Sequence, residues 1–153
     1  MKSTQNMNAP SYCDPDRFQA LAEALLRPEA GVDRSSLYLC AESSDFLRFN
    51  RSALRQATTV QQARVTLAVE RGQRRAESTL TLGGEPTLDM QRLTVERALL
   101  LSQLDLIADD PWLLCPKTAS HSTRNNHGTL PEPGRVMALV HELAGAQLKQ
   151  DLV

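Results

Sequence analysis

A length of 153 residues fits a single domain, and a hydrophobic fraction of 41% suffices for a core. Lys and Arg number 17 against 18 Asp and Glu, so the formal net charge of −1 argues against a protein built to bind the nucleic-acid backbone. The longest apolar stretch covers only residues 98–101, far short of the roughly 20 that a membrane span needs. Residues 1–10 hold no apolar core of a signal peptide, and three widely spaced cysteines do not indicate a disulfide framework. We therefore expect a cytoplasmic protein without a membrane partner.

A short helix is expected after a disordered leader over residues 1–13. Asp14 is a good N-cap, and Pro15 suits the first helical position because its missing N–H costs nothing there. Apolar residues then follow at helical spacing: Phe18, Leu21, Ala22 and Leu25. Pro28 is expected to end this helix.

Alternation with a period of two predicts a series of short strands. The expected strands are residues 36–42, 45–50, 53–58, 64–70 and 75–82. In the fourth, the residues expected to point inward are Val65, Leu67 and Val69, and those expected to point outward are Arg64, Thr66, Ala68 and Glu70. In the fifth, one face is expected to carry Ala76, Ser78, Leu80 and Leu82. Short strands joined by tight turns can pair antiparallel, with one face left to solvent.

Two further helices are expected in the second half of the chain. The first begins at Pro86, ends at Asp110-Pro111 and buries Leu93, Leu100, Leu104 and Ile107. A final helix follows Pro133, with one apolar side formed by Val136, Leu139, Val140 and Leu143. Residues 113–134 contain three prolines and two glycines, which is typical of a linker or functional loop.

The predicted fold class is therefore α+β: a mainly antiparallel sheet of short strands, packed by two longer helices, plus a C-terminal helix. The predicted organisation is a leader over residues 1–13, an α+β N-terminal domain over 14–112 and a loop or linker over 113–134. Residues 135–153 are expected to form the C-terminal helix and the truncated start of a next strand.

We predict no catalytic residue and no metal ligand in this chain. His141-Glu142 begins like a zinc-peptidase helix motif, but no second histidine follows it, so a solvent-facing pair is favoured. Cys115, His121 and His127 could form a small metal-dependent site, although structural zinc ligands normally come in close pairs. Incidental loop residues are the preferred interpretation of these three.

Arginines dominate residues 48–75, where seven of them face a single acid, Glu70. This cluster could let a stand-alone interaction module bind an acidic protein or nucleic acid. Stacking aromatics are nearly absent, however, and the helix expected over residues 85–110 carries six acids. A solvated sheet face, partly balanced by that helix, is therefore favoured.

One stretch of the sequence resembles a known family. The order Asp45-Phe46-Leu47-Arg48-Phe49-Asn50, a turn, and Leu54-Arg55-Gln56 is similar to the N-terminal domain of the TldD/PmbA family, metallopeptidases once labelled modulators of DNA gyrase. Asp109-Asp110-Pro111 with Leu113-Leu114, and the loop into the helix at Arg135, also resemble this family's layout. The resemblance covers residues 14–153.

The resemblance implies a non-catalytic domain that helps to form a substrate cleft and pairs with a second TldD/PmbA-type subunit. In such enzymes a zinc-activated water hydrolyses peptide bonds, and the zinc motif lies in the C-terminal part. Ala146 stands where the second histidine of that motif would be, so this chain is predicted to be inactive alone and to hold no cofactor. The residues expected to face the cleft are Arg48, Asn50 and Arg55.

Overall fold

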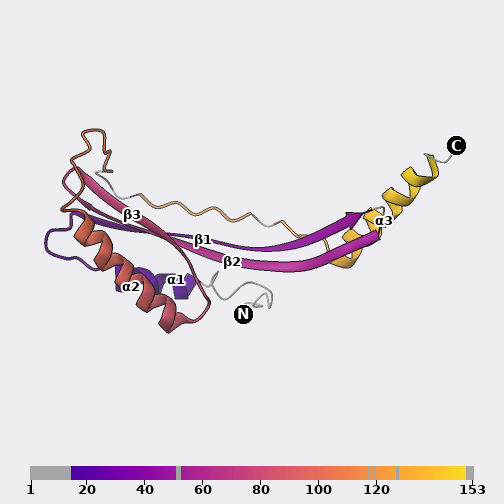
Figure 1. Cartoon of the computed structure of the whole chain (residues 1–153), viewed down its shortest axis with the longest axis horizontal. Coiled ribbons are helices and arrows are strands. Elements are labelled where there is room, and N and C mark those ends of the chain that lie inside the picture. Colours follow the sequence, from indigo (N-terminus) through magenta and orange to yellow (C-terminus); the bar gives the residue numbers. More distant parts are fainter. Residues whose placement is uncertain (1–14, 51–52, 117, 119, 127, 151–153) are drawn as a thin grey trace. The chain divides into compact units, whose positions relative to one another are not determined.

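Within residues 15–50, 53–116, 118, 120–126 and 128–150, which the computed structural model describes, the chain forms three strands and three helices (Figure 1). In chain order these are α1 (Pro15–Leu25), β1 (Arg34–Asn50), β2 (Ala53–Arg71), β3 (Arg74–Thr81), α2 (Pro86–Gln103) and α3 (Pro133–Gln150). The strands form one antiparallel sheet in the order β1-β2-β3. The predicted α+β class is confirmed.

Strands β1 and β2 are longer than the alternation pattern indicated. The runs expected at 36–42 and 45–50 lie in one strand of 17 residues, and those expected at 53–58 and 64–70 lie in one of 19. Neither junction contains the glycine or proline that would stop a strand. Side-chain hydrogen bonds from Gln62 to Glu42 and from Thr59 to Asp45 join the strands there instead.

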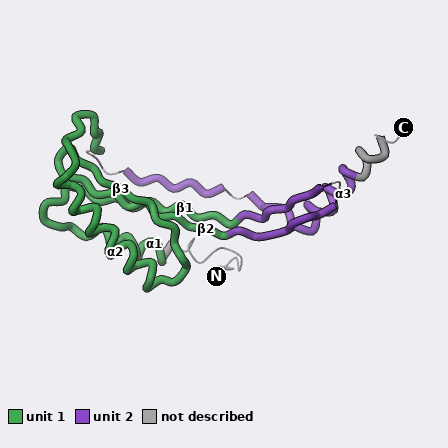
Figure 2. The backbone as a smooth tube through the Cα atoms, viewed as in Figure 1, with its two compact units in different colours: residues 1–43, 61–116 green, residues 44–60, 117–153 purple. Residues whose placement is uncertain are grey.

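The chain divides into two units, which we describe separately (Figure 2). Unit 1 comprises residues 1–43 and 61–116, and unit 2 comprises residues 44–60 and 117–153. Residues 44–60, which the sequence analysis assigned to the domain over 14–112, thus group with the C-terminal helix. The leader expected over 1–13 and the strand start expected at 151–153 lie outside the described residues.

In unit 1, helices α1 and α2 cover one face of the sheet. The residues predicted to point inward on β2 lie opposite the face predicted for β3, with Val65 opposite Leu80 and Val69 opposite Ala76. The core side chains on this face and on the helices are Leu21, Leu25, Ala63, Val65, Leu67, Val69, Ala76, Leu93, Leu100 and Leu104. The predicted apolar side of α2 is therefore confirmed, with Ile107 packed at its edge.

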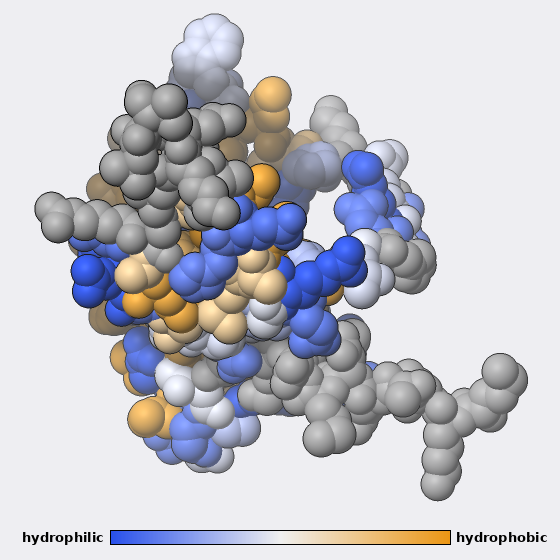
Figure 3. Space-filling model, turned by 90° about the vertical axis from the view of Figure 1, so that its right-hand side faces the viewer, coloured by the Kyte–Doolittle hydropathy of each residue, from blue (hydrophilic) through white to orange (hydrophobic). Residues whose placement is uncertain are grey.

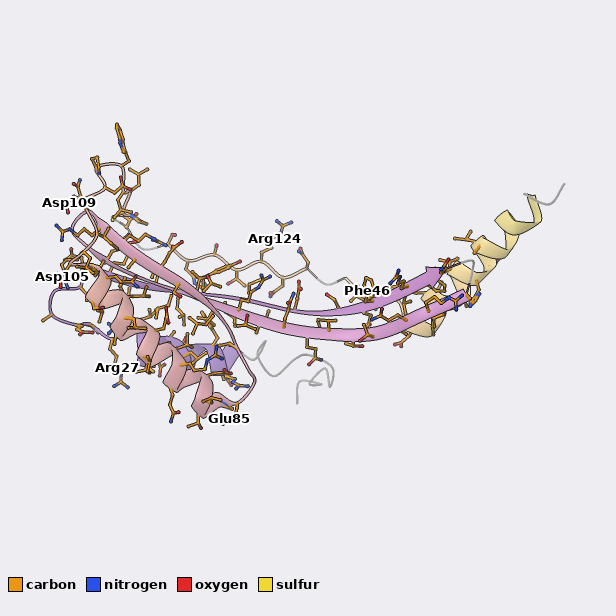
Figure 4. The ribbon with its side chains drawn as sticks, viewed as in Figure 1. Arg27, Phe46, Glu85, Asp105, Asp109 and Arg124 are labelled. Atoms are coloured by element: carbon orange, nitrogen blue, oxygen red, sulfur yellow. The ribbon has the colours of Figure 1, made fainter. Side chains whose placement is uncertain are left out.

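Both helices of unit 1 end earlier than expected. α1 stops at Leu25, before Pro28, and α2 stops at Gln103, well before Pro111. Beyond α2, the carboxylates of Asp105 and Asp109 bind Arg71 and Arg74 at the β2–β3 turn (Figure 4). These two ion pairs hold the segment after α2 against the turn between β2 and β3, where the chain no longer continues as a helix.

In unit 2, α3 packs on the hairpin formed by residues 44–60. The ring of His141 meets that of Phe49 edge-on, with centroids 5.8 Å apart. Val136 and Val140 are half-buried, whereas Leu139 and Leu143 are exposed, so the predicted apolar side of α3 is wrong for these two leucines. A two-stranded hairpin is too narrow to cover so broad a stripe, and no described side chain of unit 2 is fully buried.

Candidate functional site

The open face of the hairpin in unit 2 carries the most prominent group of exposed functional side chains. Because successive residues of a strand point to opposite faces, Phe46, Arg48 and Asn50 share one face of β1. All three are exposed, whereas Leu47 and Phe49 on the other face are half-buried. Phe46 is 52% exposed, which is unusual for an aromatic side chain (Figure 4).

Arg55 lies on the other face of this hairpin. The hydroxyl of Thr59 donates to the carboxylate of Asp45 over 2.7 Å, which requires both side chains to be on the same face. Phe49 is four residues from Asp45 on β1, and Arg55 is four residues from Thr59 on β2, so both lie on this same face. Arg48 lies on the opposite face. The structure therefore brings Arg48 and Asn50 together and separates Arg55 from them.

This face combines three kinds of recognition chemistry. Arg48 forms no ion pair with the residues that the structure describes, the Asn50 amide can donate and accept, and Phe46 offers apolar surface. Strand β1 pairs only with β2 among the described strands, so its outer edge has backbone N–H and C=O groups available. In Figure 3, hydrophobic and strongly hydrophilic residues lie next to one another on the surface that faces the viewer.

In unit 1, the buried carboxylate of Glu70 is the centre of a polar cluster. Its residue is 4% exposed, and its carboxylate binds Arg75 at 2.6 Å and Arg34 at 3.3 Å. The Cys115 thiol donates to the same carboxylate at 3.4 Å, and Arg34 also donates to the Pro116 carbonyl at 2.9 Å. Glu70 thereby ties the segment after α2 to the sheet.

The expectation that Ala68 and Glu70 point to solvent is wrong. Their side chains do lie on the face opposite the core, as alternation requires, but both residues are buried. The segment ending at Cys115 and Pro116 returns over this face, and two arginines compensate the charge of Glu70. The only signal in the sequence was the excess of arginine around a single acid.

Arg75 is held by two carboxylates. Its guanidinium binds Glu70 at 2.6 Å and Glu77 at 2.8 Å. The hydrogen bond to Glu77, followed by that to Glu70, raises the pKa of Arg75 above its ordinary value despite partial burial. Arg75 therefore stays charged at neutral pH. The stability that its two ion pairs provide is lost only when the pH rises through the raised pKa of the folded state.

The Gly83-Gly84 loop binds a carboxylate of its own chain. The backbone N–H groups of Gly83 and Gly84 donate to the two oxygens of Asp89, at 2.8 and 2.9 Å. Gly84 has a φ of 99°, a conformation that favours glycine. At the start of α2, Glu85 accepts the amides of Thr87 and Leu88. These loop amides are thus already bound to carboxylates of the same chain.

The histidines and cysteines considered for a metal each have another partner or lie outside the described residues. Cys115 donates to Glu70, His121 contacts the Thr123 hydroxyl at 3.2 Å, and His141 packs on Phe49. His127 and Cys13 lie outside the described part of the chain. Within that part, no three His, Cys, Asp or Glu residues are grouped as a metal would need.

A small pocket lies between α1 and α2 in unit 1. It has a volume of about 90 Å³ and is lined by Leu21, Leu82, Met90 and neighbouring residues. Small-molecule sites usually have volumes of about 300 Å³ or more, so this pocket is not the candidate site.

Searches of protein-family models, curated proteins and solved structures found no match to this chain. Among the described helices, none is long and apolar enough to cross a membrane. The open hairpin face with Phe46, Arg48 and Asn50 is the candidate functional site.

Proposed function

We propose that this chain is the non-catalytic substrate-cleft and subunit-interface domain of a TldD/PmbA-like zinc metallopeptidase, and that it binds an extended peptide along β1. The observation that carries the proposal is the open hairpin face, where Phe46, Arg48 and Asn50 lie beside a strand edge. An added peptide strand gains main-chain hydrogen bonds from such an edge, while side chains on the open face select its sequence.

The zinc of these enzymes does not fit the residues present here. His141 packs against Phe49, and Ala146 stands where a second histidine ligand would be needed. The chain's own contribution is therefore to bind and orient the peptide, with Arg48 favouring an acidic peptide side chain and Phe46 an apolar one.

The first prediction concerns the affinity of this face for a peptide. A fluorescent octapeptide with the repeat Thr-Val-Thr-Glu, which presents Val and Glu in turn on one face of an extended strand, is expected to bind the full chain. Arg48→Ala is expected to weaken binding about two- to fivefold, the usual effect of losing one exposed charge pair. The readout is fluorescence anisotropy at low and high salt. Raising the salt should weaken wild-type binding more than variant binding, because one attractive charge is missing from the variant.

Arg55→Ala is the matched control. It removes the same charge from the same hairpin but from the opposite face, and its effect should be smaller than that of Arg48→Ala. Equal effects of the two substitutions, or no binding of the octapeptide, would contradict the peptide-binding role.

The subunit role is tested by gel filtration with a full-length TldD/PmbA-type protein. Co-elution supports the proposal, whereas retention on nucleic acid alone favours a separate interaction module. Against that alternative, Arg71, Arg74 and Arg75 already bind carboxylates of their own chain.

A further inference from the structure

The hydrogen bonds at the two sides of β2 show which of its residues face β1. The carbonyl of Ala63 accepts the N–H of Leu82, the residue that follows β3, so the backbone groups of Ala63 face β3. Successive residues of a strand direct their backbone groups to opposite sides, so the neighbouring Gln62 faces β1. Every second residue from Gln62 towards the start of β2 faces β1 in the same way.

Two side-chain hydrogen bonds fix the register between β1 and β2. The Gln62 amide donates to Glu42, and the Thr59 hydroxyl donates to Asp45. The two contacts are three residues apart on both strands, so no bulge interrupts the pairing between them. Because Gln62 faces β1, Glu42 opposite it faces β2, and so does every second residue of β1 after Glu42.

The outer edge of β1 in unit 2 is therefore formed by the residues in between. Asp45, Leu47 and Phe49 direct their backbone N–H and C=O groups away from β2. Among the described residues, no backbone hydrogen bond from another segment reaches this edge in unit 2. The side chains on the open face belong to the alternate residues, Phe46 and Arg48. The backbone groups that can bind a peptide and the side chains that can select its sequence thus come from different residues of β1.

The orientation of an added strand determines which of its residues would bind this edge. In an antiparallel pair, two residues directly opposite one another exchange both hydrogen bonds and share a face. An antiparallel peptide would bind through the residues opposite Asp45, Leu47 and Phe49, and would turn the intervening side chains to the open face. In a parallel pair the assignment is reversed, because each bonding residue reaches the two residues that flank the one opposite it.

We propose that the peptide pairs antiparallel with the β1 edge and carries an acidic residue two positions before an apolar one. This inference rests on the proposed function and specifies its substrate class. β1 already belongs to an antiparallel sheet, and antiparallel pairing is the more stable per residue. In this orientation the acidic residue lies opposite Arg48 and the apolar one opposite Phe46. Both positions are of the closely spaced kind without hydrogen bonds, where cross-strand side chains are nearest.

N-methylated peptides test the pairing while the protein stays unchanged. In one version of the Thr-Val-Thr-Glu octapeptide the three internal threonines are N-methylated, and in the matched control the residues that precede them are. Methylation of the threonines removes the N–H groups that bind β1 and is expected to weaken binding at least about tenfold, because each such bond contributes roughly a factor of two to ten. The control modifies N–H groups that face solvent and should change the Kd less than about threefold.

Two peptides of identical composition test the orientation. One places Glu-Thr-Val in the middle of a run of threonines, and the other places Val-Thr-Glu there. Antiparallel pairing is expected to favour the first by about two- to tenfold in Kd, measured by fluorescence anisotropy. Arg48→Ala should reduce this preference, because it removes the partner of the glutamate.

Equal weakening by the two methylation patterns would overturn the inference, because a paired strand uses only alternate N–H groups. Greater weakening by the control pattern, or a preference for Val-Thr-Glu, would show parallel pairing and would also overturn it. In these cases the peptide-binding role stands if the unmethylated octapeptide still binds more weakly to Arg48→Ala. An unmethylated octapeptide that does not bind contradicts both proposals. Gel filtration at the same protein concentrations detects another occupant: a dimer that the peptide dissociates would place a second copy on this edge and overturn the inference.

Discussion

Glu70→Gln is expected to lower the free energy of unfolding by about 2–3 kcal/mol, because it removes the negative charge that two arginines share in a buried site. The side chain of Glu70 is 5% exposed, so its charge is stabilised by Arg75 and Arg34 rather than by water. Those arginines are 40% and 32% exposed, which places the cost at the lower end of what a broken buried pair involves. Urea denaturation followed by circular dichroism measures the change as a shift in midpoint at constant slope.

Glu77→Gln is the matched control for this prediction. Glu77 binds the same guanidinium of Arg75, but its side chain is 56% exposed. Its replacement should therefore cost less than about 1 kcal/mol, as is usual for surface ion pairs. Equal costs for the two substitutions would mean that the burial of Glu70 does not matter to its interaction, and the prediction would fail.

The fold was predictable from sequence where the evidence was local. Alternation in residues 64–70 and 75–82 gave the correct pairing faces of β2 and β3, and the spacing of Leu93, Leu100 and Leu104 gave the core side of α2. Both patterns depend only on the periods of strand and helix. The lengths of β1 and β2 were not predictable in this way, because serine and threonine at the junctions neither require nor forbid a break.

The sites were less predictable because they depend on residues far apart in the chain. Glu70 is buried by Arg34, Arg75 and Cys115, which come from three separate segments. The face on which Arg55 lies depends on the register of the hairpin, where a shift of one residue would exchange the two faces. Arg55 was expected beside Arg48 from the family resemblance, and the residue pattern alone does not fix the register that separates them.

Exposed apolar residues were also invisible to sequence reasoning. Helical spacing predicted one apolar side of α2, formed by Leu93, Leu100 and Leu104. A helix that is apolar on two sides is expected to be covered on both. Only the exposure of Leu88, Val95 and Leu99 shows that the second side faces solvent in the single chain.

The last prediction concerns the loop that leads into α2. Asp89→Ala is expected to lower the free energy of unfolding by about 2–4 kcal/mol, because it leaves the amides of Gly83 and Gly84 without their acceptor in a partly buried loop. Asp89 is 3% exposed, so the space left by its carboxylate is poorly placed for water to satisfy both donors. Thermal unfolding of both proteins measures the loss, expected to be roughly 3 °C in Tm per kcal/mol for a chain of this size.

Glu85→Ala is the comparison that isolates burial. Glu85 also accepts two backbone amides, those of Thr87 and Leu88, but it is exposed, and removal of such an N-cap typically costs about 1 kcal/mol. The two substitutions thus remove a carboxylate with the same number of backbone partners, one from the interior and one from the surface. A larger loss of unfolding free energy for Asp89→Ala than for Glu85→Ala would show that the buried bonds to Gly83 and Gly84 are the more stabilising ones. If Glu85→Ala costs as much, the amides of Gly83 and Gly84 find other acceptors, and Asp89 is not what fixes the entry into α2.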